Sequence, residues 1–296
     1  MCDDITEIEN AKYFKDQQSG VSRRTFGAIA GVGGLSTLFA GCKAGETTQG
    51  IVENDVNVET PDGIVDSYYV HPASGTHPAV ILWPDIMGLR PSFKTMGKRL
   101  AMAGYSVLVV NPFYREAKHP VISDGENFSM PEVRERLRPM ARALTPQAQV
   151  SDANAFLAWL NAQPNVDTSR KVGIMGYCMS GSFTMRAAAA RPGRIGAGAS
   201  FHGGRLATDR EDSPHLLVPQ MKSGFLFAIA ENDDERDPEA KNLLREAYDK
   251  AGLFAEIEVY AGARHGWCPP DSLVYNEAQA EKAWARLLSL FETYLV

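Results

Sequence analysis

Hydrophobic and polar residues alternate in two neighbouring stretches of the chain, residues 52–59 and 65–70. Pro61, Asp62 and Gly63 lie between them and are typical of a tight turn. Alternation with a period of two places apolar side chains on one face of a strand. The pattern therefore predicts an antiparallel hairpin that opens the fold.

The pattern changes beyond this hairpin, where short apolar runs alternate with amphipathic stretches of helical period. The apolar runs are residues 79–83, 106–110, 172–175, 224–229 and 255–259. The helical stretches are residues 92–103, 131–144, 147–162, 182–190, 238–251 and 278–295. Strands that alternate with helices predict an α/β fold, with a mostly parallel sheet covered by helices on both faces. Residues 113–130 form the longest irregular stretch, and we expect a surface or cap loop there.

The first 41 residues differ from the rest of the chain. Arg23 and Arg24 stand in front of a weakly apolar stretch, residues 27–40, that several glycines interrupt. This stretch is too short to cross a hydrocarbon core of about 30 Å as a helix. It resembles a bacterial twin-arginine export signal, which implies the export machinery as a partner and removal of the signal afterwards. We therefore expect a signal peptide over residues 1–41, a linker over 42–50 and one domain over 51–296.

The end of this segment contains a candidate lipidation site. Residues 38–42 read Leu-Phe-Ala-Gly-Cys and resemble a lipobox, in which Cys42 would receive a lipid anchor. The alternative is ordinary signal cleavage nearby, which leaves Cys42 as a surface thiol or removes it. Both alternatives predict an exported protein, either periplasmic or anchored to the envelope.

Composition and charge exclude several classes of function. Thirty basic and 36 acidic residues give a net charge of -6, and no run of Lys or Arg forms a stripe for nucleic acid. The six histidines show no HExxH spacing, and no CxxC pair occurs, so we expect no metal and no other cofactor. Cys2 leaves with the signal, and the odd number of remaining cysteines argues against a disulfide framework.

A cysteine lies at a predicted corner between a strand and a helix. The apolar run at 172–175 leads into Gly176-Tyr177-Cys178-Met179-Ser180-Gly181, and a helical stretch follows. Small residues two places before and after Cys178 permit the sharp turn that exposes a nucleophile above a sheet. The helix N-terminus behind it favours a thiolate. The alternative is that Cys178 is a small core residue.

An acid and a histidine follow Cys178 in the order expected of a catalytic triad. Asp233 and Asp234 come after the run 224–229, and His265 follows the run 255–259. Active sites of α/β sheets lie at the carboxyl ends of the strands, where these residues fall. Asp233 is favoured over Asp234 as the acid because it lies closer to the strand end. Its role would be to hold His265 in the tautomer that faces the sulfur.

Acyl transfer also needs backbone N–H groups that stabilise an oxyanion. The residue after the nucleophile and the first strand-to-helix loop usually supply them, which indicates Met179 and Ile86. Asp85, next to Ile86, is a candidate pocket residue or a simple turn residue. The loops at the strand ends contain further candidate pocket residues: Tyr114, Arg115, Tyr177, His202 and Trp267.

These motifs resemble the dienelactone hydrolase family of α/β hydrolases, over about residues 51–296. The resemblance rests on residues 176–181, 231–233 and 265–267, and on the terminal helix with Trp284 and Phe291. It implies an α/β-hydrolase fold, Cys178 as nucleophile, Asp233 and His265 as its partners, and Ile86 and Met179 as oxyanion donors. The sequence departs from the family at Asp85, where the family has Glu, and at Ser180, where it usually has Gly. The family's substrate-binding Arg after the histidine is replaced by residues 268–270, Cys-Pro-Pro.

The expected function is hydrolysis of activated esters or lactones through an acyl-enzyme on Cys178. A thiolate leaves more readily than an alkoxide, so its adduct proceeds only when the substrate carries a good leaving group. Enol lactones, aryl esters and thioesters meet this requirement, and the expected partner is a small-molecule ester or lactone. The alternative is a non-catalytic exported binding protein on the same scaffold.

Overall fold

The computed structural model describes residues 9–10, 12–13, 15 and 50–296. The predicted signal motif at Arg23 and Arg24 and the candidate lipidation site Cys42 lie outside the described residues and stay predictions. Among the described residues, no helix combines the length and the apolar character needed to span a membrane.

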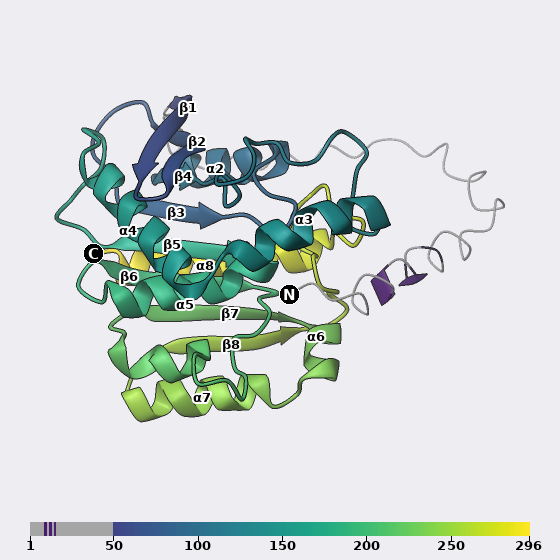
Figure 1. The fold of residues 1–296 in the computed structure, drawn as a ribbon. Coiled ribbons are helices and arrows are strands. Elements are labelled where there is room, and N and C mark those ends of the chain that lie inside the picture. Colours follow the sequence, from purple (N-terminus) through teal and green to yellow (C-terminus); the bar gives the residue numbers. More distant parts are fainter. Residues whose placement is uncertain (1–8, 11, 14, 16–49) are drawn as a thin grey trace, which may run out of the picture.

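A single eight-stranded sheet forms the centre of the described chain, with the order β1-β2-β4-β3-β5-β6-β7-β8 (Figure 1). The strands are β1 (Ile51–Thr60), β2 (Gly63–Pro72), β3 (Ala79–Trp83), β4 (Ser106–Val109), β5 (Val172–Tyr177), β6 (Ile195–Phe201), β7 (Gly224–Ala230) and β8 (Ala255–Tyr260). The β1–β2 and β2–β4 pairs are antiparallel and all other neighbours are parallel. The predicted hairpin and the predicted parallel sheet are both confirmed.

Helices cover both faces of this sheet, as the alternating pattern predicts (Figure 1). They are α2 (Pro91–Met102), α3 (Pro131–Ala143), α4 (Pro146–Asn161), α5 (Gly181–Ala190), α6 (Glu231–Arg236), α7 (Ala240–Ala251) and α8 (Glu277–Tyr294), with short 3-10 turns η1 (Cys178–Ser180) and η2 (Pro214–Gln220). One core cluster joins the sheet to α3, α4, α5 and α7, and the other joins it to α2 and α8. These six helices, α2, α3, α4, α5, α7 and α8, thus bury their apolar side chains in the core on one face of the sheet or the other.

The strand β6 is not among the strands predicted from the apolar runs. Its sequence, IGAGASF, is too rich in Gly and Ala to read as a β-branched strand. Packing explains the small residues, since a Cβ at Gly198 would lie 2.1 Å from the ring of Phe225, and one at Gly196 would lie 2.3 Å from the carbonyl oxygen of Tyr294. Close packing against these neighbours therefore requires small residues in β6, although such residues have low strand propensity.

Two segments after strand ends determine the shape of the site. Residues 113–130 contain no helix or strand, as expected for the cap loop. After β7 the chain forms the short helix α6, which is not among the predicted helical stretches. The carboxyl ends of β3, β5, β6, β7 and β8 lie at the same edge of the sheet, so their following segments meet there (Figure 1).

Candidate active site

Cys178 lies at a strained corner between β5 and α5. Its φ angle is 55°, in the left-handed region that residues other than glycine seldom adopt. A Cβ at Gly176 would lie 2.3 Å from the carbonyl oxygen of Ser180, so the turn requires glycine there. Strain of this kind costs about 1–3 kcal/mol and persists where the surroundings enforce it. The geometry agrees with the nucleophile elbow predicted from the spacing.

Ser180 fixes this corner from below. Its buried Oγ accepts a hydrogen bond from the Tyr177 amide at 2.9 Å. The same oxygen lies 2.8 Å from the carbonyl oxygen of Pro84 and 3.0 Å from that of Trp83, either of which can accept its proton. Ser180 therefore joins the elbow to the loop after β3. A glycine, which the family usually has here, would lack both contacts.

His265 lies between Cys178 and Asp233. Its Nδ1 is 2.7 Å from Oδ2 of Asp233, and its amide donates to Oδ1 of Asn232 at 2.8 Å. Burial lowers the pKa of His265, but the charges of Asp233 and Cys178 and hydrogen bonds to both side chains outweigh burial and raise it well above its ordinary value. Because Nδ1 faces Asp233, the second ring nitrogen is left for the sulfur.

Asp234, the competing acid, has a different partner. Its two carboxylate oxygens accept from Nζ of Lys241 at 2.5 Å and 2.7 Å. It follows Asp233 on the short helix α6, and the two side chains therefore point in different directions. The geometry supports Asp233 as the partner of His265.

The backbone around Cys178 offers two donors for an oxyanion. The Ile86 amide donates to no backbone carbonyl in the turns and loops of the described residues, and the Met179 amide lies in the first turn of η1, where helical amides lack an intrahelical acceptor. The loop of Ile86 is shaped by Asp85, whose Oδ1 accepts from the Met87 amide at 2.9 Å and whose carbonyl accepts from the Gly88 amide at 3.0 Å. Asp85 thus acts as a turn residue and also lines the cavity that contains Cys178.

A buried ion pair holds Asp85 in place. The Arg90 guanidinium donates to both carboxylate oxygens of Asp85, at 2.7 Å and 2.9 Å, and its Nε donates to Asp271 at 2.7 Å. Arg90 is 2% exposed, so this network lies in low dielectric. Burial raises the pKa of Asp85 and the nearby Cys178 adds to this rise, while Arg90 opposes it. No sequence signal indicated Arg90 or Asp271, since neither belongs to a motif.

A cavity of about 720 Å³ opens above Cys178. Cys178, His265, Asp85, Ile86 and His202 contribute to its wall, together with residues 122–129 of the cap loop. This volume suits a small organic molecule. The cavity brings together five of the residues that the sequence predicted for the site.

His202 packs directly against His265. Their ring centroids lie 4.9 Å apart in an edge arrangement, and Trp267 packs on the other side at 5.3 Å. His202 has a φ angle of 40°, and neither ring nitrogen has a hydrogen-bond partner among the described residues. Burial lowers the pKa of His202 well below its ordinary value, and the neighbouring His265 lowers it further. A neutral imidazole therefore supports the ring of His265.

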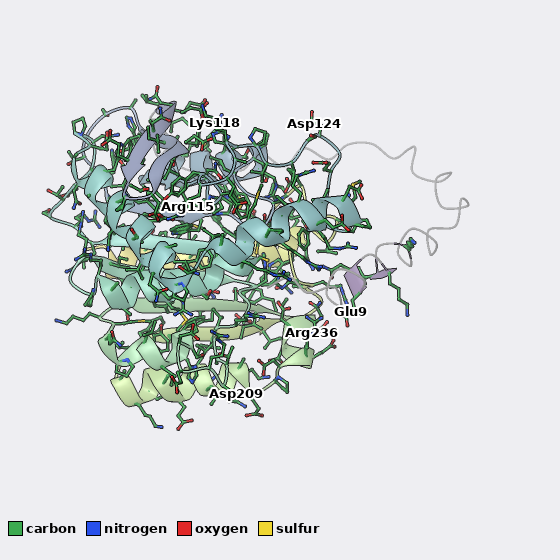
Figure 2. All side chains as sticks on the ribbon, in the orientation of Figure 1. Glu9, Arg115, Lys118, Asp124, Asp209 and Arg236 are labelled. Carbon is green, nitrogen blue, oxygen red and sulfur yellow. The ribbon has the colours of Figure 1, made fainter. Side chains whose placement is uncertain are left out.

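Four other candidate pocket residues line neither of the two cavities described for this chain. Tyr177 stacks on Phe201 at 4.8 Å, and Trp267 is buried against Tyr260. Tyr114 donates to Asp152 at 2.8 Å. Arg115 (Figure 2) pairs with Asp62 at 2.5 Å and with Asp152 at 2.7 Å. These partners satisfy the hydrogen-bonding groups of Tyr114 and Arg115 within the fold.

Cys268 is a free thiol in a different environment from Cys178. It is 6% exposed and belongs to the core cluster on the α2 and α8 face, whereas Cys178 belongs to the opposite cluster. Burial raises the pKa of Cys268 well above its ordinary value. A neutral buried thiol is a poor nucleophile, which fits a structural role.

Two residues from the start of the chain reach the site. Nδ2 of Asn10 donates to the His265 carbonyl at 2.8 Å, and Asn10 also lines the larger cavity. Glu9 pairs with Arg236 at 3.0 Å (Figure 2). The sequence gave no indication of this contact, because both residues precede the predicted export motif.

The described residues contain no group of three or more His, Cys, Asp or Glu side chains that could hold a metal ion. A mostly parallel sheet with a cysteine at a strand-to-helix corner defines an α/β-type hydrolase. The chain matches the dienelactone hydrolase family over residues 65–295 and belongs to that family. It is a hydrolase that acts on esters or lactones.

Relatives and solved structures agree with this assignment. A chain from Methylorubrum extorquens is 27% identical over 291 residues and covers 94% of both proteins. A carboxymethylenebutenolidase from Rhodococcus opacus is 25% identical over 234 residues, which cover 77% of this chain and 86% of that one. The dienelactone hydrolase structure from Anabaena variabilis superposes with a TM-score of 0.59 at 18% identity, covering 83% of this chain and 99% of that chain. The structural likeness concerns the fold alone.

Proposed function

We propose that the protein hydrolyses activated carboxylic esters or lactones through a covalent acyl-enzyme on Cys178. The observation that carries this proposal is the position of Cys178, at a strained corner in the larger cavity and hydrogen-bonded to a histidine that Asp233 orients. Such a chain of nucleophile, base and orienting acid serves nucleophilic catalysis. Carboxymethylenebutenolidase, the name of the Rhodococcus relative, denotes a lactone hydrolase, which supports the substrate class.

In the resting enzyme the proton of Cys178 lies on the second ring nitrogen of His265, and in the acylation step the Cys178 thiolate attacks the carbonyl carbon. The carbonyl electron pair moves onto oxygen, where the amides of Ile86 and Met179 stabilise the negative charge. When this pair returns, the bond to the leaving oxygen breaks and His265 donates its proton to the leaving group. The products are a thioester on Cys178 and a free alcohol or enol.

In the deacylation step, a water molecule attacks the thioester. Neutral His265 takes one proton from this water, and a second oxyanion forms at the same amides. The carbon–sulfur bond breaks, the Cys178 thiolate and a carboxylic acid are released, and the proton taken from water stays on His265, which restores the thiolate–imidazolium pair. The raised pKa of His265 makes it a competent proton carrier through both steps.

The test is hydrolysis of aryl esters, enol lactones and thioesters by the full chain. We expect Cys178→Ala to abolish turnover, while Cys268→Ala, which removes the other described free cysteine, keeps it within about threefold because Cys268 lies in the opposite core cluster. Hydrolysis that survives in Cys178→Ala at the parent rate would contradict the proposal. Unactivated amides should react far more slowly than aryl esters.

We further propose that the protein is exported through the twin-arginine pathway to the bacterial periplasm or envelope. The support is the sequence motif at Arg23 and Arg24 and the lipobox-like residues that end at Cys42. Cell fractionation of the full chain should place a shortened product outside the cytoplasm, and replacing both arginines by lysine should retain the precursor inside. Membrane attachment that Cys42→Ala abolishes would identify the lipid anchor. Full-length protein that stays in the cytoplasm for the parent chain as well as for the double-lysine variant would contradict export.

A further inference from the structure

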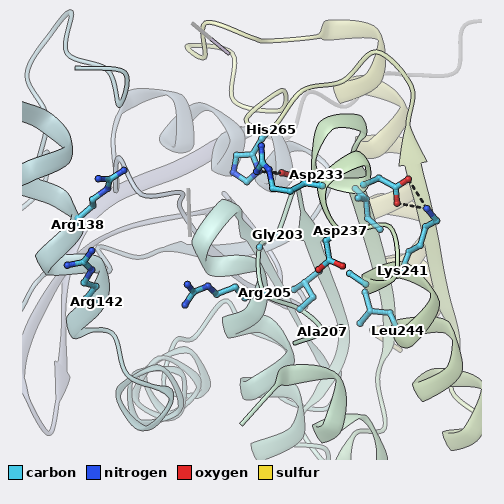
Figure 3. Close-up of a pocket in the computed structure, with 16 residues that line it drawn as sticks. Arg138, Arg142, Gly203, Arg205, Ala207, Asp233, Asp237, Lys241, Leu244 and His265 are labelled. Carbon is cyan, nitrogen blue, oxygen red and sulfur yellow. Dashed lines mark hydrogen bonds and ion pairs between the residues drawn. The ribbon is translucent and has the colours of Figure 1, made fainter. Parts of the chain in front are cut away.

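A second cavity, of about 390 Å³, lies beside the proposed triad (Figure 3). Asp233 and His265 line it, so the two cavities share His265, but Cys178 belongs only to the larger one. The remaining wall comes from α3, from the segment after β6, and from α6 and α7. Five cationic side chains lie on this wall: Arg138, Arg142, Arg205, Arg236 and Lys241.

Two of these cations have no partner in the described protein. Arg142 and Arg205 are exposed and make no hydrogen bond, ion pair or ring contact with any described residue. Lys241 is neutralised by Asp234 at 2.5 Å, and Arg236 pairs with Glu9 at 3.0 Å. The side chains of Arg142 and Arg205 therefore keep their charge available for a ligand.

The carboxylates that line the cavity do not neutralise all of its positive charges. Asp233 is engaged by His265 and Asp234 by Lys241, which leaves Asp237 as the third carboxylate on the wall. Against it stand the exposed guanidinium groups of Arg142 and Arg205. Several guanidinium groups around one cavity attract carboxylate or phosphate oxygens, which they bind with paired hydrogen bonds.

The backbone of Arg205 supports a ligand-binding role. Its φ angle is 56°, in the left-handed region, and it directly follows Gly203 and Gly204. A strained conformation at a non-glycine residue is typical of functional positions. In Figure 3 the Arg205 side chain extends toward the side of the cavity where Arg138 and Arg142 lie.

We propose that this cavity binds an anionic group, a carboxylate or a phosphate, on the leaving-group half of the substrate. The inference rests on the proposed function: the acyl half stays on Cys178 in the larger cavity, and the leaving group departs beside His265, which donates its proton. His265 lines both cavities, which places the smaller cavity next to the residue that protonates the leaving group. Arg142 and Arg205 then select among esters according to the charge of their leaving group.

The experiment compares esters that share one acyl group. The substrates are the 4-carboxyphenyl, 4-phosphonooxyphenyl and neutral 4-carbamoylphenyl esters of acetic acid, which form the same acyl-enzyme. We expect the full chain to hydrolyse at least one anionic ester with a kcat/KM roughly tenfold above that of the neutral one. The comparison between the two anionic esters distinguishes a carboxylate site from a phosphate site.

Variants then assign the preference to the arginines. Arg142→Gln with Arg205→Gln should remove the preference and raise KM for the anionic ester about tenfold or more, while the kcat/KM of the neutral ester stays within about threefold. Arg210→Gln is the matched control, because Arg210 is exposed, pairs with Asp212 and lies outside the cavity. Equal rates on anionic and neutral esters in the parent, or an equal loss on both in the double variant, would overturn the proposal.

A binding measurement separates this proposal from the proposed function. Inorganic phosphate should raise the Tm of the parent chain and of Arg210→Gln but not of the double variant, whether or not any ester is hydrolysed. Hydrolysis of the neutral ester without anion preference would leave the proposed function intact and reject the anion site. A phosphate shift that is equal in parent and double variant also rejects it.

Discussion

At the scale of single residues, the chemistry depends on how His265 is charged. Asp233 Oδ2 lies 2.7 Å from its Nδ1, and the pKa of His265 is raised well above its ordinary value despite burial. An imidazolium between a carboxylate and a thiolate is stabilised on both sides. The buried His202 ring next to it carries no charge to oppose this, because its own pKa is lowered.

Removing the charge of Asp233 should lower the pKa of His265. In Asp233→Asn the opposing carboxylate is gone, so the imidazolium loses its proton at lower pH, and ester turnover should fall about 10²- to 10⁴-fold. NMR titration of the His265 ring measures the pKa directly. In the parent chain the ring should remain protonated above pH of about 6.5, the ordinary midpoint for histidine.

Asp234→Asn provides the control for this titration. It removes a neighbouring carboxylate of the same helix, but one that pairs with Lys241. The pKa of His265 and the turnover should both stay close to those of the parent. A titration of His265 that is unchanged in Asp233→Asn, or equally lowered in both variants, would show that Asp233 does not set the charge state.

Arg90 should contribute strongly to stability because it neutralises buried Asp85. Arg90→Met leaves Asp85 without its cation, which costs about 3–5 kcal/mol in the free energy of unfolding for a buried pair. Asp271→Asn removes the more exposed partner, whose side chain is 41% exposed, and should cost about 1 kcal/mol or less. Urea unfolding of both variants measures the difference, and equal losses would disagree with this ranking.

At the scale of elements, the sequence predicts the strands that are apolar and the helices that are amphipathic. The prediction locates β5 and α5 to within two residues, from the run 172–175 and the stretch 182–190. It thereby also locates the corner that contains Cys178. The strand β6 is not predicted because close packing requires small residues there, and Gly and Ala have low strand propensity. The residues that impose this packing are Phe225 and Tyr294, which are distant from β6 in the sequence.

The packing of β6 predicts a steep cost for one methyl group. Gly198→Ala would place a Cβ 2.1 Å from Phe225, so the free energy of unfolding should fall by about 1–3 kcal/mol. Gly193→Ala is the control, since a Cβ there meets no atom within 4 Å, and its effect should be about 0.5 kcal/mol or less. Similar thermal unfolding of the two variants would contradict the packing account.

At the scale of the whole molecule, the site is assembled from residues that the topology brings together. Chain order and strand ends predict that Cys178, Asp233 and His265 meet, because parallel strands end at one edge. The same reasoning cannot find Arg90, which belongs to no motif, or Asn10, which contacts His265 across 255 positions of the chain. Nor can it foresee that Asp62 and Asp152 engage Arg115, since such pairing depends on side-chain positions.

The measurement that tests the central claim most directly is the mass of the protein during turnover of an aryl ester. Rapid acid quenching followed by peptide mapping should reveal one acyl group on the peptide that contains Cys178, formed in a burst and lost as deacylation proceeds. Cys178→Ala should show neither the adduct nor the burst. Turnover without any adduct, or an adduct on another residue, would contradict the account.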